Sequence, residues 1–322
     1  MIVDGHVHVF PEITGLAAQR EENIETVCDQ YGRLVGIRHV KMTQPWSRDR
    51  PLMDFRHTPE MLIANMDFAR VDRAVLLQGP AYGECNDYVA DAVRNYPDRL
   101  IGAAYIDPWE PGFRGKFERI ARSSFCAAKI ELTDNWGLNA LHPGVVLDDP
   151  QVSWLYGELE RREFVLVLDL GSVGSRSYQT RAVRGIAEEH PNLKVVICHL
   201  AQPTPDAEAD HRLWRMWEDQ IGLGKLRNVW FDTAAVCAYV RDEGFPFPTA
   251  GRYFKMAVER IGPQKIIWGT DMPMTLDFMT YPELVEIAYL HSRFLPPAEQ
   301  AMVLGENAKR VYDLRRAAER GI

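Results

Sequence analysis

The sequence predicts an α/β protein in which strands and helices alternate along one domain. Eight short runs rich in Val, Ile, Leu and Ala recur between segments with helical periodicity, and 322 residues suffice to close eight such units into a barrel. The runs are residues 2–10, 73–79, 100–108, 126–132, 164–171, 194–201, 228–235 and 265–273. We therefore expect a (β/α)8 barrel, the TIM-barrel architecture, over residues 1–322.

The predicted strands and helices differ in their hydrophobic pattern. Runs such as "FVLVLDLG" (164–171) are apolar almost throughout, as expected for parallel strands that are buried on both faces. Residues 58–71, 86–97 and 281–294 instead have apolar residues at helical spacing. The first of these begins with Thr58 as the N-cap and Pro59 at the first helical position, which marks a helix start.

One connection breaks the regular alternation. Residues 11–57 separate the first predicted strand from the first helix, far more than the few residues of a usual βα connection. In a barrel, this segment lies at the C-terminal face of the strands, where active sites are built. We expect a long loop that serves as a substrate lid or as part of a subunit interface, so a homodimer is one expected state.

Composition narrows the class of protein. A formal net charge of −8 argues against nucleic acid as a partner, because phosphate binding needs a basic surface. No apolar run approaches the ~20 residues of a membrane span, and the N-terminus lacks a signal-peptide pattern. The five cysteines are scattered without C-x-x-C spacing, which indicates reduced thiols. We expect a cytoplasmic enzyme with a small-molecule substrate.

Polar residues gather where the predicted strands end. His6 and His8 are two apart, so their imidazoles point the same way from the first strand. Other ionisable residues near the ends of later runs are Lys129, Glu131, Asp169, His199, Asp232 and Asp271. Burying such groups is costly unless they are paired or bind a cation. Histidine with carboxylate suits zinc and similar divalent ions, so we expect a metal site, with zinc first and manganese as the alternative.

Five motifs, in order along the chain, resemble the amidohydrolase-related family of the amidohydrolase superfamily. They are "DGHVH", "NDYVADAVRNYPDRLIGAAYIDP", "HPNLKVVICHLAQP", "IIWGTDMP" and "LGENAKRVYDL". The resemblance implies that His6 and His8 are metal ligands, and that Asp271 is a ligand that also handles a proton during turnover. It also implies that His199 is a catalytic histidine that polarises the substrate or orients the attacking water.

The sequence departs from the family pattern at one expected ligand. Family members usually have a further histidine at the end of strand five, where this chain has Asp169. Asp169 could bind the metal through its carboxylate, or the site could be weakened or empty, as in a lactonase branch thought to work without metal. Glu131 is a second candidate ligand, because other branches of the superfamily recruit a carboxylate from strand four.

The resemblance implies a hydrolase that opens a C–O bond of a lactone or a C–N bond through a metal-activated water. The alternatives are a non-oxidative decarboxylase or hydratase of an unsaturated or aromatic acid, and a metal-independent lactonase. Decarboxylases of the family often replace the first histidine of H-x-H with glutamate. This chain keeps both histidines, which favours hydrolysis. A barrel that only binds a ligand fits the retained polar residues poorly.

Residues outside the ligand set suggest where the substrate binds. Trp136 follows the fourth predicted strand, Arg176 follows the fifth, and Arg48 lies in the long insertion. We expect these three to contact a small carboxylated or ring-containing substrate. Lys129 is interpreted as a structural lysine in the barrel mouth, whose stem packs against apolar neighbours. Asp232 is interpreted as a carboxylate that holds an imidazole of the site.

Overall fold

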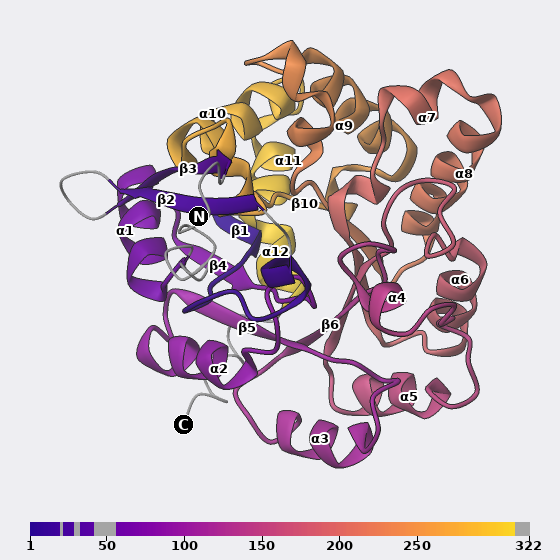
Figure 1. Cartoon of the computed structure of the whole chain (residues 1–322). Coiled ribbons are helices and arrows are strands. Elements are labelled where there is room, and N and C mark those ends of the chain that lie inside the picture. The colour runs from indigo at the N-terminus through magenta and orange to yellow at the C-terminus, as the bar shows by residue number, and fades with distance from the viewer. Residues whose placement is uncertain (20–21, 29–32, 42–55, 313–322) are drawn as a thin grey trace.

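The structure, a computed structural model, describes residues 1–19, 22–28, 33–41 and 56–312, and its centre is an eight-stranded parallel sheet. The strands are β1 (Val3–Val7), β4 (Arg73–Leu76), β5 (Leu100–Tyr105), β6 (Ala127–Glu131), β7 (Val165–Asp169), β8 (Lys194–Ile197), β9 (Val229–Asp232) and β10 (Ile266–Ile267). Each falls within one predicted run, so the predicted (β/α)8 barrel is confirmed (Figure 1).

Hydrogen bonds between the first and last strands complete the ring. The sheet order runs from β1 through β4 to β10 with every neighbouring pair parallel. At the seam, the Gly5 amide donates to the Trp268 carbonyl at 2.8 Å, and the Asp271 amide donates to the His6 carbonyl at 2.8 Å. The first and last strands of the sheet are therefore joined, and the sheet closes into a barrel.

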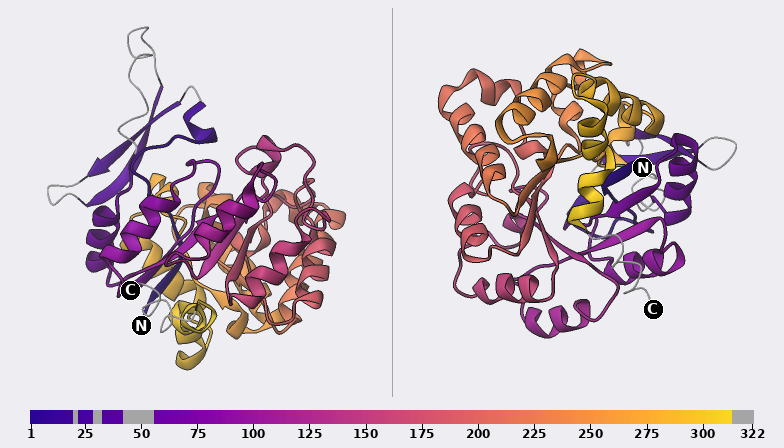
Figure 2. Two further views of the ribbon diagram at one scale, coloured as in Figure 1. Left: turned by 90° about the horizontal axis from the view of Figure 1, so that it is seen from below. Right: turned by 180° about the vertical axis from the view of Figure 1, so that it is seen from behind.

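Helices surround the strands, as Figure 2 shows. The longer ones are α1 (Pro59–Ala69), α2 (Asn86–Asn95), α3 (Phe113–Ile120), α5 (Ser153–Arg161), α6 (Thr180–Glu189), α8 (His211–Ile221), α9 (Pro248–Ile261) and α10 (Tyr281–Ser292). Short α-helices are α4 (Leu138–Leu141), α7 (Pro205–Ala209), α11 (Pro297–Ala301) and α12 (Asn307–Val311). The 3-10 helices are η1 (Leu16–Gln19), η3 (Cys198–Ala201), η4 (Gly222–Lys225), η5 (Val236–Glu243), η6 (Pro263–Lys265) and η7 (Met274–Asp277), and η8 (Met302–Glu306) is a π-helix. The Thr58 side chain accepts a hydrogen bond from the Met61 amide, so the predicted N-cap of α1 is confirmed.

The strands divide their side chains between two cores. Alternate residues such as Val165 and Val167 belong to a smaller cluster with Tyr312, which lies within the barrel. Leu166 and Leu168 belong to the larger cluster, which also contains helix residues. Both faces of the strands are therefore apolar, which explains why the sequence runs show no alternation.

The insertion is not simply a long loop. Within residues 11–57 the described segments include β2 (Glu22–Cys28) and β3 (Leu34–Lys41), which pair antiparallel. Figure 2 shows this pair projecting from the end of the barrel opposite the N-terminus. The loop expectation missed these strands, although both stretches contain β-branched residues that favour strands. The roles as lid or subunit interface stay predictions, and Arg48 lies outside the described residues.

Two further expectations concern the chain as a whole. No helix in the described ranges is long and apolar enough to cross a bilayer. Cys85, Cys126, Cys198 and Cys237 are free thiols.

Candidate metal centre and active site

Three predicted ligands meet at the C-terminal end of the barrel. His6 belongs to β1, His8 follows it, and Asp271 follows β10. The seam hydrogen bond from the Asp271 amide to the His6 carbonyl brings the two segments together, and the Asp271 backbone adopts a left-handed φ of 65°. The ring centroids of His6 and His8 are 5.1 Å apart. Residues 265 positions apart in the sequence thus become neighbours.

Backbone contacts fix the tautomer of His8. Its Nδ1 lies 2.7 Å from the Leu77 carbonyl oxygen, which can only accept, so Nδ1 carries the hydrogen. Burial lowers the pKa of His8, which favours the neutral ring. The lone pair of Nε2 then faces Asp271 Oδ1 at 2.9 Å. Two acceptors at this distance repel each other unless a cation or a proton lies between them.

His6 repeats the same arrangement. Its Nδ1 donates to Asp232 Oδ2 at 3.0 Å, which leaves the lone pair on Nε2. That Nε2 is buried, has no hydrogen-bond partner among the described residues, and lies 3.5 Å from Asp271 Oδ1. Burial, and then the charge of Lys129, hold the pKa of His6 well below its usual value. A cation bound between His6 Nε2 and the Asp271 carboxylate would satisfy this buried lone pair.

The donor set therefore fits a divalent metal. One ligand atom each from His6, His8 and Asp271 lie within 4.8 Å of one another. Two neutral imidazoles and one carboxylate make up a common zinc ligand set.

Asp232 forms a hydrogen bond with the imidazole of His6, as the sequence predicted. Its Oδ2 accepts from His6, and its Oδ1 accepts from the backbone amides of His199 at 2.8 Å and Ala234 at 3.1 Å. The carboxylate is completely buried at the end of β9. Such a partner fixes both the tautomer and the orientation of a ligating imidazole.

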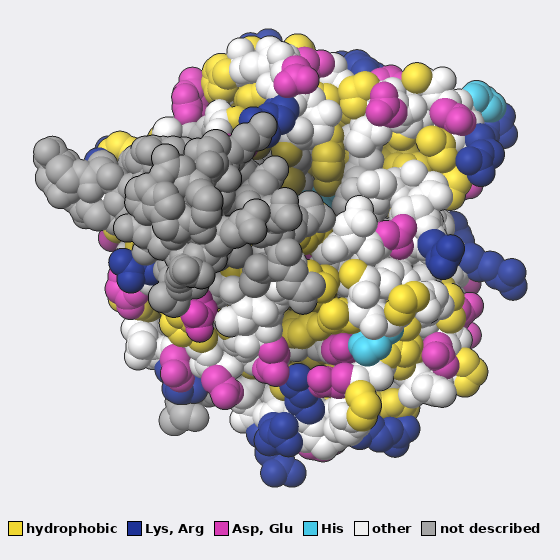
Figure 3. All heavy atoms as spheres, viewed as in Figure 1, with side chains coloured by type: hydrophobic (Ala, Val, Ile, Leu, Met, Phe, Trp, Pro, Cys, Tyr) yellow, Lys and Arg dark blue, Asp and Glu magenta, His cyan; other side chains and the backbone are white. Residues whose placement is uncertain are grey.

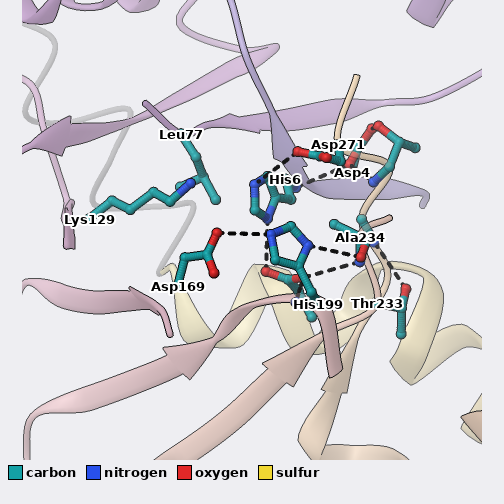
Figure 4. A network of polar contacts seen from close by, with 12 residues as sticks. Asp4, His6, Leu77, Lys129, Asp169, His199, Thr233, Ala234 and Asp271 are labelled. Carbon is teal, nitrogen blue, oxygen red and sulfur yellow. Dashed lines mark hydrogen bonds and ion pairs between the residues drawn. The ribbon is translucent and has the colours of Figure 1, made fainter. Parts of the chain in front are cut away.

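His199 and Asp169 form a separate pair (Figure 4). His199 Nε2 lies 3.1 Å from Asp169 Oδ2, and its Nδ1 lies 3.0 Å from the Ala234 carbonyl oxygen. Burial opposes the charge of His199, but Asp169 and the other nearby carboxylates outweigh it and raise the imidazole pKa to about 10. The same contact holds the pKa of Asp169 below its usual range, against the effect of burial. His199 is thus a fixed cation whose ring nitrogens both face protein acceptors.

Glu131 and Lys129 lie together at the end of β6. Lys129 is buried, and its Nζ is 3.4 Å from Glu131 Oε2. Burial raises the pKa of Glu131 to about 7, despite the lysine charge. The groups of three potential ligands in the described ranges include neither Glu131 nor Asp169.

Two residues predicted to bind substrate lie in turns that follow barrel strands. Trp136 is half-buried in the turn after β6, and Arg176 is exposed in the turn after β7. Two site residues were not singled out from the sequence. Tyr239 of η5 lies close enough to Asp169, Asp271 and Asp232 for their charges, after burial, to raise its pKa. Asp4 contacts residues from the other end of the chain, and no local pattern marks it.

Hydrophobic side chains gather near the centre of the face of the molecule that Figure 3 shows. A (β/α)8 barrel that carries histidines and aspartates at the C-terminal end of the barrel belongs to the class of barrel enzymes. The model of the amidohydrolase family matches residues 3–314. The chain therefore belongs to the amidohydrolase family and is an enzyme of the amidohydrolase type.

Solved structures with similar folds include hydrolases and a decarboxylase. An amidohydrolase from Burkholderia multivorans with bound zinc has a TM-score of 0.70 at 16% identity, over 97% of this chain and 99% of that chain. A probable 2-pyrone-4,6-dicarboxylic acid hydrolase from Acinetobacter baumannii with bound citric acid has a TM-score of 0.65 at 18% identity, over 97% and 99%. The 5-carboxyvanillate decarboxylase of Sphingomonas paucimobilis has a TM-score of 0.61 at 16% identity, over 97% and 98%. No curated protein matches this chain.

Proposed function

We propose that this protein is a metal-dependent hydrolase that opens a C–O bond of a lactone or a C–N bond of a small carboxylated or ring-containing substrate. One observation carries the proposal. The Nε2 lone pairs of His6 and His8 and a carboxylate oxygen of Asp271 converge, and the His6 lone pair lacks a partner among the described residues. A divalent cation satisfies all three groups at once, whereas a proton between His8 and Asp271 would leave the Nε2 lone pair of His6 without a partner among the described residues.

His6, His8 and Asp271 would hold the metal, for which zinc is our first choice. A relative of similar fold contains bound zinc, which supports this choice. When bound, a divalent cation lowers the pKa of water from about 15.7 toward about 7 and polarises the bond to be broken.

Asp271 would move the proton. Its side chain is 18% exposed, whereas the side chains of His6 and Asp232 are completely buried, so Asp271 is the more accessible of these three. As an ionised carboxylate, it accepts a proton from the attacking water and returns it to the leaving group.

His199 would supply a fixed positive charge. Both of its ring nitrogens face protein acceptors, and its ring centroid lies 4.9 Å from that of His6. We infer that it stabilises negative charge developing on the substrate through its field and does not donate to the substrate directly. This role differs from direct polarisation of the substrate.

Lys129 supports a substrate with a carboxylate. A buried ammonium is costly unless an anion compensates it, and its described ion-pair partner, Glu131, is 3.4 Å away. Figure 4 shows the Lys129 side chain extending toward the centre of the site. The citric acid bound by the Acinetobacter relative is itself a small polycarboxylate.

The same buried ammonium favours one second candidate, a non-oxidative decarboxylase, because it could hold the carboxylate that is lost. The similarity in fold to the 5-carboxyvanillate decarboxylase of Sphingomonas paucimobilis supports this second candidate. A panel of lactones, amides and aromatic acids separates the two functions. A hydrolase opens a lactone or amide without gas release, whereas a decarboxylase releases one carbon dioxide for each substrate consumed.

The proposal is tested first by elemental analysis of purified, untagged protein before and after chelation. We expect about one zinc or manganese ion per chain. On the substrate found by the panel, Asp271→Asn should lower turnover by roughly 10²- to 10⁴-fold, because it removes the proton acceptor. The exposed Asp242→Asn serves as the matched control and should retain turnover. Near-normal turnover of folded Asp271→Asn would refute this mechanism.

A further inference from the structure

The first motif contains a third polar residue, Asp4, that the proposed chemistry does not use. Asp4 is completely buried, and it lies two residues before His6 in β1. An ionisable side chain in that position is costly unless its oxygens are satisfied. Its contacts are therefore informative about what the carboxylate does.

Four donors converge on the two oxygens of Asp4. Oδ1 accepts from the backbone amides of Thr270 at 3.0 Å and His6 at 3.1 Å. Oδ2 accepts from the Thr270 hydroxyl at 2.6 Å and from the Tyr281 hydroxyl at 2.9 Å. One carboxylate thus joins β1, the segment after β10, and the start of α10.

These contacts hold the backbone at two of the proposed metal ligands, His6 and Asp271. The amide of His6 is held directly, and Thr270 is the residue immediately before Asp271. The Thr270 hydroxyl also accepts from the Met272 amide at 3.2 Å, so it bridges the residues that flank Asp271. Figure 4 shows Asp4 beside Asp271.

The backbone of Asp271 needs such support. Its φ of 65° lies in the left-handed region, which residues other than glycine adopt at a cost in free energy. Strained backbone persists where the surrounding contacts determine it, and the Asp4 contacts lie immediately next to this residue. We propose that Asp4 is a positioning residue that sets His6 and Asp271 in register for metal binding, through a clamp formed with Thr270 and Tyr281.

The proposed role of Asp4 depends on the proposed metal centre, and it explains what positions two of the ligands. The backbone hydrogen bonds of the seam hold Asp271 and Met272 against the first strand, and the Asp4 contacts add hydrogen bonds to Thr270, the residue immediately before Asp271. Partners that orient ligands typically change metal affinity by about 10- to 100-fold when they are removed. Asp4 would act in this way on two ligands at once.

The test measures the zinc affinity of the whole protein by competition with a chelator, together with the visible spectrum of the cobalt-substituted protein. Tyr281→Phe removes one hydroxyl donor to Asp4. We expect it to weaken zinc binding several-fold and to shift the cobalt bands. Tyr156→Phe is the matched control, because Tyr156 is also buried and donates to the Leu147 carbonyl at 2.6 Å on α5, away from the site.

Asp4→Asn keeps the size of the side chain but replaces one acceptor oxygen with an amide donor. We expect zinc affinity to fall by about 10- to 100-fold, with Asp4→Glu recovering part of the loss. If Asp4→Asn does not fold, Tyr281→Phe decides the question. A lower melting temperature with unchanged zinc affinity and cobalt spectrum would show that Asp4 is only structural. Failure of the unmodified protein to bind zinc or cobalt would overturn the metal centre and the clamp together, whereas normal binding in all variants would overturn the clamp alone.

Discussion

Asp169 could be a metal ligand or a hydrogen-bond partner of His199, and its contacts distinguish these two roles. One of its oxygens contacts His199, and the other accepts from the Gly171 amide at 3.1 Å and from the Gln202 side chain at 3.3 Å. A carboxylate engaged in this way is already satisfied without a metal. Of the alternatives that the sequence leaves open, the contacts favour a metal site built without Asp169.

We predict that Asp169→Asn retains close to one zinc ion per chain with an affinity within about threefold of the unmodified protein. The reason is that the three lone pairs of His6, His8 and Asp271 are unchanged, whereas loss of a true ligand costs far more. Elemental analysis and chelator competition measure the effect, with His8→Asn as the comparison that should lose the metal. Loss of zinc from both variants would make Asp169 a ligand.

Single residues differed in how well the sequence predicted them. The two-residue period of a strand was enough to place His6 and His8 side by side. Asp232 was predicted to hold an imidazole, because it ends a strand that must converge with the others. Asp4 was missed, since its partners Thr270 and Tyr281 lie 266 and 277 residues away and no periodic pattern connects them.

Elements were predicted well where burial on both faces produced a continuous apolar run. All eight barrel strands fall within such runs, but they are shorter because the last residues of each run turn into the active-site loops. Residues 198–201, for example, belong to the predicted sixth run but form η3, in which His199 and Leu200 have positive φ. The β2/β3 pair was missed because its position in the long insertion favoured a loop.

The end of β4 gives a prediction at this scale. A Cβ atom at Gly79 would overlap Glu131 Oε2, so Gly79→Ala must displace that carboxylate and disturb its ion pair with Lys129. We expect the free energy of unfolding to fall by about 1–3 kcal/mol, as for other overpacked sites. Urea unfolding measures the change.

The control for Gly79→Ala is Gly185→Ala in α6, where nothing lies within 4 Å of the added atom. Alanine should stabilise that helix by roughly 0.5–1 kcal/mol. An equal effect of the two substitutions would mean that Glu131 moves aside freely.

At the scale of the whole molecule, the proposed metal centre lies across the seam of the barrel. His6 belongs to the first strand and His8 directly follows it, whereas Asp271 comes from the segment after the last strand. The backbone hydrogen bonds and the Asp4 contacts already join these segments, and a bound metal would add a further link. Metal binding should therefore stabilise the closed barrel as well as enable chemistry.

We predict that chelation lowers the free energy of unfolding of this protein by an amount set by the metal concentration and its dissociation constant. A ligand that binds only the folded state at 100 times its dissociation constant contributes about 2.7 kcal/mol. Thermal and urea unfolding with and without chelator measure this difference. Asp271→Asn should lose most of it, because that variant lacks the ligand supplied by the last strand. A chelator effect of equal size in Asp271→Asn would mean that the metal binds elsewhere and does not link the two ends of the barrel.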